Sequence, residues 1–125
     1  MIPTFDLRIG NWITVENEIY RVSGISETKV NLKGVKAAVS PDVLHPIGIT
    51  PEILQTAGFK QREKTDIYDK IPSEGFTYQL HSHKILLFHG RDNTLGHWLT
   101  TRIVYVHQMQ NFYYYLTGRE IPFSF

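Results

Sequence analysis

The sequence predicts an α+β domain: a small curled antiparallel sheet of the SH3-like barrel type, then a short helix, an antiparallel meander and a C-terminal amphipathic helix. Three observations predict it. Short alternating segments fill residues 7–49, a strong helix start lies at Thr50-Pro51, and one apolar stripe of helical period covers residues 104–117. The chain has 125 residues, an ordinary size for one domain. We therefore expect a single domain, 1–125, with an SH3-like β subdomain (1–49) and a second part (50–125).

The first 49 residues are expected to form short strands joined by tight turns. Alternating apolar residues place these strands at residues 7–14, 19–22, 30–32 and 35–39. Gly10 interrupts the first of them, which indicates a β-bulge, and Gly24 is expected to end the second. Short strands at this spacing are typical of small barrels. We expect Trp12 to fill the core of the barrel.

A short helix is expected directly after residue 49. Thr50 can cap it, and Pro51 suits the first helical position, where an N–H would have no partner. Glu52 favours the positive end of the helix dipole. Gly58 can end the helix in a left-handed conformation, with Phe59 closing the cap by an apolar contact.

The stretch up to residue 101 predicts a β-meander. Residues 60–74 are polar and carry Pro72, so we expect a weak strand and a loop there. Three further strands are expected at residues 76–80, 84–89 and 94–101.

The C-terminal helix is expected over residues 104–117, with Gly118 as its stop. It carries two stripes. The apolar stripe, typical of a core, consists of Val106, Met109, Tyr113 and Leu116. The second stripe consists of His107, Asn111 and Tyr114, with Tyr115 beside it.

Composition excludes several classes of protein. Apolar residues make up 42% of the chain, so a core can form and the chain is not wholly disordered. The absence of cysteine excludes a disulfide framework, a thiolate metal site and a thiol nucleophile. Thirteen basic and twelve acidic residues nearly cancel, which gives no support to non-specific nucleic-acid binding. The start of the chain does not read as a signal peptide, and we expect a cytoplasmic protein without a membrane partner.

Three segments together resemble a family of small proteins encoded by phages and prophages of Bacteroidota. Residues 7–13 (LRIGNWI) are similar to the family's opening, and residues 106–121 (VHQMQNFYYYLTGREI) are similar to its ending. Between them, residues 50–59 match the pattern T-x-E-x-L-x-x-x-G-F. The resemblance implies a mobile-element gene, acting in the cytoplasm of a bacterial host. It carries no functional residue over to this chain.

Histidines are the first candidates for chemistry. His81 and His83 would share one face of a strand, with His89 of the same parity and His97 on a neighbouring strand. Three histidines can hold a catalytic zinc ion. However, no carboxylate lies at ligand spacing and there is no H-E-x-x-H motif, so we expect solvated or hydrogen-bonded histidines, with no metal and no cofactor.

Other catalytic patterns are missing from the sequence. There is no G-x-S-x-G elbow, the nine glycines do not form a phosphate-binding loop, and the carboxylates form no evident acid–base pair. We therefore expect a protein that is not an enzyme and that acts by binding.

The expected partner is another macromolecule, most simply a protein. The second stripe of the C-terminal helix joins aromatic area to hydrogen-bonding groups without charge, which is typical of protein-binding surfaces. The alternative for that stripe is structural: His107 and Asn111 would cap a neighbouring loop, with Tyr114 packed over them. Small genes of mobile elements often encode accessory factors, including inhibitors of host defence such as anti-CRISPR proteins, and we expect this role.

Two other functions stay open. The N-terminal β subdomain, with Trp12, Tyr20, Arg21 and several lysines, could be a nucleic-acid-binding module. A nucleotide signal could instead be sequestered as a small ligand. The sequence leaves the partner's identity and the oligomeric state open.

Overall fold

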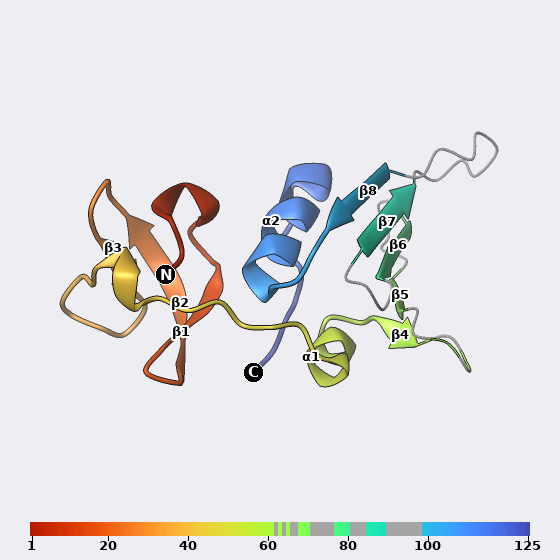
Figure 1. Cartoon of the computed structure of the whole chain (residues 1–125), viewed down its shortest axis with the longest axis horizontal. Coiled ribbons are helices and arrows are strands. Elements are labelled where there is room, and N and C mark those ends of the chain that lie inside the picture. The colour runs from red at the N-terminus through yellow and green to blue at the C-terminus, as the bar shows by residue number, and fades with distance from the viewer. Residues whose placement is uncertain (62, 64, 66–67, 71–76, 81–84, 90–98) are drawn as a thin grey trace. The chain divides into compact units, whose positions relative to one another are not determined.

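The computed structural model describes residues 1–61, 63, 65, 68–70, 77–80, 85–89 and 99–125. These residues form an α+β structure with two antiparallel sheets and two α-helices, which confirms the predicted class (Figure 1). The chain divides into two compact units. The first comprises Met1–Ile49 and Tyr105–Glu120, and the second comprises Thr50–Val104 and Ile121–Phe125. The division at residue 49 coincides with the expected subdomain boundary, whereas the C-terminal helix belongs to the first unit.

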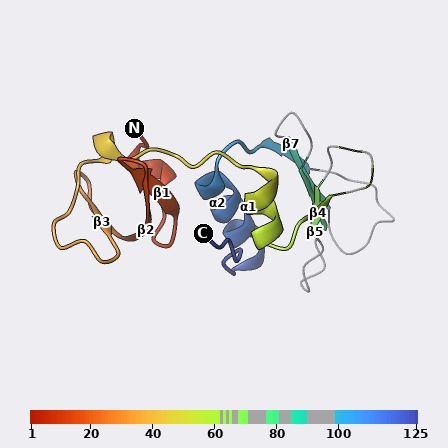
Figure 2. The same cartoon turned by 90° about the horizontal axis from the view of Figure 1, so that it is seen from below.

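The first unit contains a three-stranded sheet in the order β1-β2-β3 (Figure 2). Its strands are β1 (Trp12–Val15), β2 (Glu18–Ile25) and β3 (Val30–Leu32). Glu16 and Asn17 join β1 to β2 with φ values of 51° and 67°, as a two-residue hairpin turn of the primed type requires. The strands in the described part of this unit do not close into a barrel, so the SH3-like part of the prediction is not confirmed.

One predicted strand of this unit begins too early, at residue 7 instead of Trp12, and another, at residues 35–39, is wrong. Residues 7–9 follow the 3₁₀ helix η1 (Thr4–Asp6) and enter a turn, because Asn11 ties itself to Arg8 through both its backbone and its side chain. Residues 35–39 form no strand; Val39 makes only an isolated bridge, exchanging two backbone hydrogen bonds with Val30. A second 3₁₀ helix, η2 (Pro41–Val43), follows.

The predicted bulge is also misplaced. Gly10 lies in the turn before β1 with φ 101°, and the irregular register lies between Val22 and Gly24 in β2. For this reason Gly24 does not end β2, which continues to Ile25. The extra residue at the shift lets the strand bend without stopping.

The core of the three-stranded sheet excludes Trp12. Ile13 is fully buried, and successive strand side chains point to opposite faces, so Trp12 lies on the other face and is half-buried. Trp12 is therefore not the core-filling residue, and that prediction is wrong. The buried cluster of the sheet consists of Ile2, Ile13, Val22, Val30, Leu32 and Leu44.

The C-terminal helix of this unit is α2 (Val106–Thr117). It begins two residues later than expected because Tyr105 is extended and pairs with Gly48 in an isolated bridge. Gln108 accepts a hydrogen bond from the Tyr105 N–H at 3.0 Å, and Gly118 ends the helix with φ 70°. Val106, Met109 and Tyr113 of the apolar stripe are buried, as predicted.

The second unit begins with α1 (Pro51–Thr56), and its sequence signals are confirmed in detail. Thr50 caps the helix by accepting a hydrogen bond from the Ile53 N–H at 3.3 Å. Gly58 has φ 88°, and the Phe59 N–H reaches back to the Leu54 carbonyl, which completes a Schellman motif. The buried Leu54 and Phe59 side chains accompany it.

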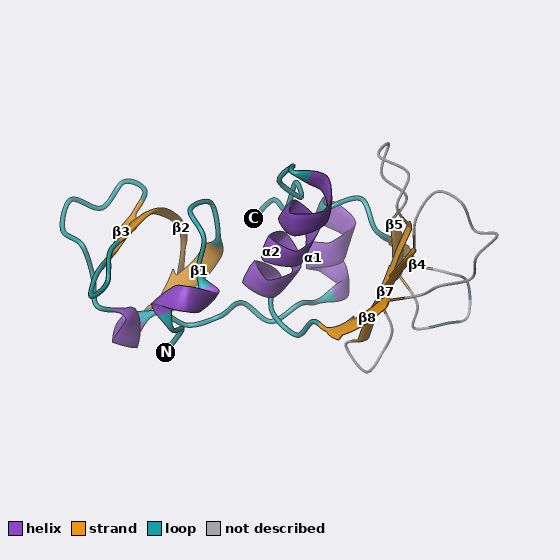
Figure 3. Cartoon of the chain, turned by 90° about the horizontal axis from the view of Figure 1, so that it is seen from above, coloured by secondary structure: helices purple, strands orange, loops and turns teal. Residues whose placement is uncertain are grey.

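A five-stranded antiparallel sheet follows in the order β4-β5-β6-β7-β8 (Figure 1), and its strands are drawn in orange in Figure 3. Each strand pairs with the next along the chain, so this sheet is the predicted meander. Its strands are β4 (Lys60–Gln61), β5 (Tyr68–Lys70), β6 (Thr77–Leu80), β7 (Ile85–His89) and β8 (Leu99–Arg102). Buried Ile121 and Phe123 of the C-terminal tail also belong to this unit, and the Ser124 N–H donates to the Thr56 hydroxyl at 3.1 Å.

No helix in the described ranges is long and apolar enough to span a bilayer. The expected location in the cytoplasm stays a prediction.

Candidate functional site

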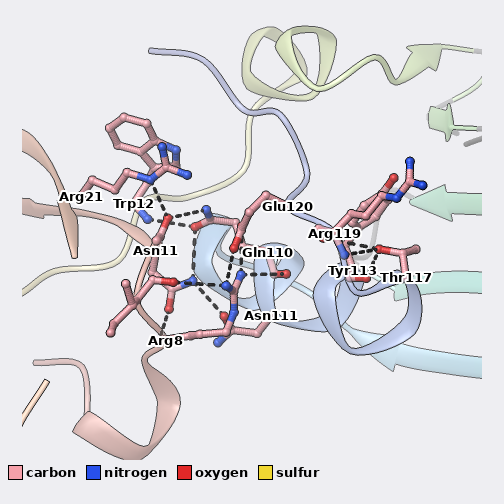
Figure 4. Close-up of polar contacts among 12 residues, drawn as sticks. Arg8, Asn11, Trp12, Arg21, Gln110, Asn111, Tyr113, Thr117, Arg119 and Glu120 are labelled. Atoms are coloured by element: carbon pink, nitrogen blue, oxygen red, sulfur yellow. Dashed lines mark hydrogen bonds and ion pairs between the residues drawn. The ribbon is translucent and has the colours of Figure 1, made fainter. Parts of the chain in front are cut away.

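A buried amide of α2 joins the helix to the N-terminal segment of the first unit. Gln110 is fully buried and uses both ends of its side chain (Figure 4). Its Nε2 donates to the Gly10 carbonyl at 2.9 Å, and its Oε1 accepts from the Trp12 N–H at 2.8 Å. Gln110 thus satisfies backbone groups at the start of β1 in the way a neighbouring strand would.

A second amide bridge lies beside the first. Asn11 is fully buried, accepts from the Arg8 N–H at 2.7 Å and donates to Oδ1 of Asn111 at 2.8 Å. Asn111 in turn donates from Nδ2 to the Asp6 carbonyl at 2.9 Å. Because buried polar groups are costly unless they are hydrogen-bonded, these contacts fix α2 against residues 6–12 in one register.

Arg8 closes the arrangement through charge and ring contacts. Its guanidinium pairs with both carboxylate oxygens of Glu120, just beyond the end of α2. The same group lies 4.2 Å from the ring centroid of Tyr114 and donates to the Ile9 carbonyl at 3.1 Å. Planar, bidentate contact of this kind is particular to arginine. We call the set Arg8, Asn11, Gln110, Asn111 and Glu120 the clasp.

The four residues expected to form a binding stripe do not share one environment. His107 is buried, and among the described residues its Nδ1 has no hydrogen-bond partner. Burial lowers the pKa of His107, and the nearby Asp6 carboxylate partly offsets this effect. Asn111 is half-buried and belongs to the clasp. Asn111 fits the structural alternative, because it caps the backbone of the loop at Asp6, whereas for His107 the capping bond of that alternative stays a prediction and only its burial is observed.

The two tyrosines are accessible. Tyr114 is 41% exposed beneath the Arg8 guanidinium, and Tyr115 is 87% exposed. His107 is therefore buried and Tyr115 is exposed, although the sequence analysis placed both in the second stripe. A binding role for the stripe stays a prediction, now limited to its tyrosines.

Two exposed apolar residues next to the clasp were not expected from the sequence. Phe5 is 86% exposed and precedes Asp6, whose carbonyl accepts from Asn111. Ile9 is 58% exposed and follows Arg8. Ile9 lies in a segment that alternates like a strand, so its exposed position could not be distinguished from a core position, and Phe5 lies in η1, for which the sequence predicted no element. We call Phe5, Ile9, Tyr114 and Tyr115 the exposed patch.

The histidines considered for a metal site fall mostly beyond the described ranges. His81, His83 and His97 are not described, and of His89 only its place in β7 is described. Within the part of the chain that the structure covers, no group of three or more potential ligands could hold a metal ion.

The clasp also relates the two most distinctive sequence motifs. All five side chains of the clasp come from residues 7–13 and 106–121. The two segments that resemble the opening and the ending of the phage-encoded family are therefore in contact with each other. Comparisons with protein-family models, with curated proteins and with solved structures found no match for this chain. The phage origin stays a prediction from the sequence.

Proposed function

We propose that this protein is a non-enzymatic accessory factor of a phage or prophage that acts by binding another protein through the exposed patch. One observation carries the proposal: Phe5 and Tyr115, two aromatic side chains exposed to 86% and 87%, belong to the two segments that the clasp joins, Phe5 directly before Asp6 and Tyr115 one turn after Asn111. Large apolar side chains on a preorganised scaffold are typical of the central contacts of protein interfaces. Inhibition of a host defence system, as by an anti-CRISPR protein, is the role that the sequence resemblance favours.

The clasp supports this proposal because its hydrogen bonds hold together the two segments that carry the patch. Asn111 lies one turn before Tyr115 on α2 and holds the backbone beside Phe5, while Arg8 stacks on Tyr114. Side chains held in place lose less conformational entropy on binding, which favours affinity. The charges of Arg8 and Glu120 are paired, so the patch is suited to an uncharged partner surface.

Affinity purification from the natural host tests the proposal, with readouts for both protein and nucleic acid. We expect the wild type to capture a protein partner that Phe5→Ser and Tyr115→Ser both lose. Ile19→Ser is the matched control, since Ile19 is a 43% exposed apolar residue of the same unit outside the patch. Equal thermal stability of all variants would show that only the surface has changed. Equal capture by the wild type and both patch variants would contradict the proposal.

A second candidate function, nucleic-acid binding, is favoured by one observation. Trp12 is half-buried outside the core, and the Arg21 guanidinium lies 5.1 Å from its ring centroid. Aromatic and arginine side chains together are common in surfaces that bind single strands. Fluorescence anisotropy with a labelled single-stranded oligonucleotide tests this function. Salt-sensitive binding that Trp12→Ala removes and Tyr115→Ser preserves would favour it over protein binding. Absorbance at 260 nm of the purified protein would reveal a bound nucleotide, the third option.

A further inference from the structure

Arg21 repeats the arrangement of Arg8 with one component missing. The Arg8 guanidinium lies over the Tyr114 ring, 4.2 Å from its centroid, and pairs with both carboxylate oxygens of Glu120. The Arg21 guanidinium lies 5.1 Å from the Trp12 ring centroid and makes no ion pair with any residue that the structure describes (Figure 4). The described part of the first unit therefore holds two arginines placed over aromatic rings, one with a carboxylate and one without.

The Arg21 guanidinium is held in place and still has donors available. Its Nε donates to the Gly10 carbonyl at 3.1 Å, and the Trp12 ring lies beside it. Neither Nη atom of Arg21 donates a hydrogen bond to a described residue, and the side chain is half-buried. A partly buried charge without a counter-ion is costly, and a group already held in place loses little conformational entropy on binding. Both properties favour the binding of an anion by Arg21.

The sheet around Arg21 offers positive charge and no negative charge. Lys33 is exposed directly after β3, and its N–H donates to the Arg21 carbonyl at 2.9 Å, so a second cationic residue is the neighbour of Arg21 across the sheet. Strand alternation and pairing register place on the same side of the sheet as Arg21 the residues Trp12, Thr14, Ile19, Gly24 and Asn31. None of these strand positions is acidic. The charge of this face is therefore complementary to an anionic group.

We propose that Arg21 is the binding site for a carboxylate of the protein partner, an aspartate or glutamate side chain in an acidic segment. The carboxylate accepts hydrogen bonds from the Nη groups of Arg21, and Lys33 adds a second positive charge. A carboxylate is favoured over a phosphate because Arg8, in the same arrangement, holds the carboxylate of Glu120. The formal net charge of only +1 also gives little attraction for a polyanion. This inference rests on the proposed function in taking the partner to be a protein, but it does not depend on the exposed patch.

Nuclear magnetic resonance of the full nitrogen-15-labelled chain tests the proposal with a defined probe, a hexaglutamate peptide. We expect saturable shifts of the Arg21 Nε–H signal and of the Trp12 indole N–H signal. The Arg8 Nε–H signal should stay in place, because Glu120 already occupies that guanidinium. Hexaglutamine, an uncharged peptide of the same length, should shift none of them. These signals locate the site in the wild type, so the test does not depend on the folding of a variant.

Two variants separate the shape of the guanidinium from its charge. Arg21→Lys keeps the charge but loses the planar set of donors, and it should weaken hexaglutamate binding at least about fivefold. Lys29→Gln is the control, because Lys29 is an exposed cation at the other end of the pairing between β2 and β3. Its loss should change the dissociation constant by less than about twofold, as expected for a distant surface charge.

Three results would overturn the carboxylate site. They are the absence of a saturable shift at Arg21, equal weakening by Arg21→Lys and Lys29→Gln, and tighter binding of a hexathymidylate strand than of hexaglutamate. The last result would assign the site to the phosphate groups of a nucleic acid. Patch-dependent capture of a host protein together with any of these results would refute this inference and leave the proposed function standing. Hexaglutamate binding at Arg21 with no protein captured from the host would do the reverse.

Discussion

Asn11 and Asn111 lie 100 positions apart in the chain and share a hydrogen bond of 2.8 Å between Nδ2 of the first and Oδ1 of the second. Each is held by a further bond, from the Arg8 N–H to Asn11 and from Asn111 to the Asp6 carbonyl. Both ends of this bridge therefore have fixed orientations. Together with the buried Gln110 it defines the register in which α2 meets the start of β1.

Gln110→Ala should be strongly destabilising. The change removes three hydrogen bonds of a fully buried side chain, each of which contributes roughly 1 kcal/mol. They are the bonds to the Gly10 carbonyl, from the Trp12 N–H and from Nδ2 of Asn11; the Gly10 carbonyl keeps its bond from Nε of Arg21 at 3.1 Å. We expect a loss of about 3 kcal/mol in the free energy of unfolding, measured by urea denaturation. The control is Gln55→Ala on α1, an exposed glutamine whose removal should change stability by less than about 0.5 kcal/mol. A stable Gln110→Ala protein would show that the clasp does not hold the unit together.

Gly10→Ala should combine two penalties. Gly10 has φ 101°, which L-residues rarely adopt, and an added Cβ would lie 3.3 Å from Oε1 of Glu120. We expect a cost of about 2–3 kcal/mol.

Two other glycines separate these penalties. Gly34 has φ 83° with no atom within 4 Å of an added Cβ, so Gly34→Ala should report the conformational cost alone, about 1 kcal/mol. Gly48 has neither feature, and Gly48→Ala should be near neutral. Equal effects at Gly10 and Gly34 would mean that the contact with Glu120 is unimportant.

Thr50→Ala should lower stability by about 1 kcal/mol, because the Ile53 N–H would lose its capping acceptor. Thr50→Ser keeps the oxygen and should restore most of the loss. Thermal unfolding followed by circular dichroism measures both. If the alanine and serine variants melt together, the cap contributes nothing.

His107 should make the protein sensitive to mild acid. Burial lowers its pKa below the usual 6.5, so the unfolded chain binds a proton at a higher pH than the folded chain does. The contribution of His107 to stability is therefore fully present above about pH 6.5 and is lost as the pH falls through its lowered folded value. The place of His107 in the first turn of α2, at the positive end of the helix dipole, acts in the same direction.

Urea denaturation at about pH 7.5 and about pH 5.5 tests this expectation. The wild type should lose more stability between the two conditions than His107→Gln, which cannot titrate. A decrease of the same size in both proteins would assign the acid sensitivity to other groups. Because each protein is compared with itself at the two pH values, any constant cost of the substitution cancels.

The sequence predicted the elements whose signals are local. α1 was predictable from Thr50, Pro51 and Gly58 because capping and left-handed termination depend on neighbouring residues. α2 and the meander were predictable from periodicity and turn residues. The segment at residues 7–10 was not, since its alternation resembles a strand while a distant glutamine and a nearby asparagine hold it as a turn.

The candidate site was predictable only in part, for the same reason. Tyr114 and Tyr115 could be identified as a face of α2 separate from the apolar stripe. The role of Asn111 depends on Asn11 and Asp6, which no helical periodicity can reveal. The available signal was the presence of side-chain amides in both motifs, Asn11 in the first and Gln110 and Asn111 in the second. That signal becomes informative only under the hypothesis that the two motifs are in contact.

The bond from Asn111 to the Asp6 carbonyl spans 105 positions, which gives the first unit a particular order of events during translation. Ribosomes add roughly 5–20 residues per second, so the segment containing Asp6 waits about 5–20 s before its helical partner is even synthesised. In that interval the nascent three-stranded sheet has no α2 beside it, and residues 50–104 of the second unit are synthesised first. The first part of the chain to leave the ribosome is thus among the last to reach its final structure, and a nascent-chain chaperone would find it open throughout that delay.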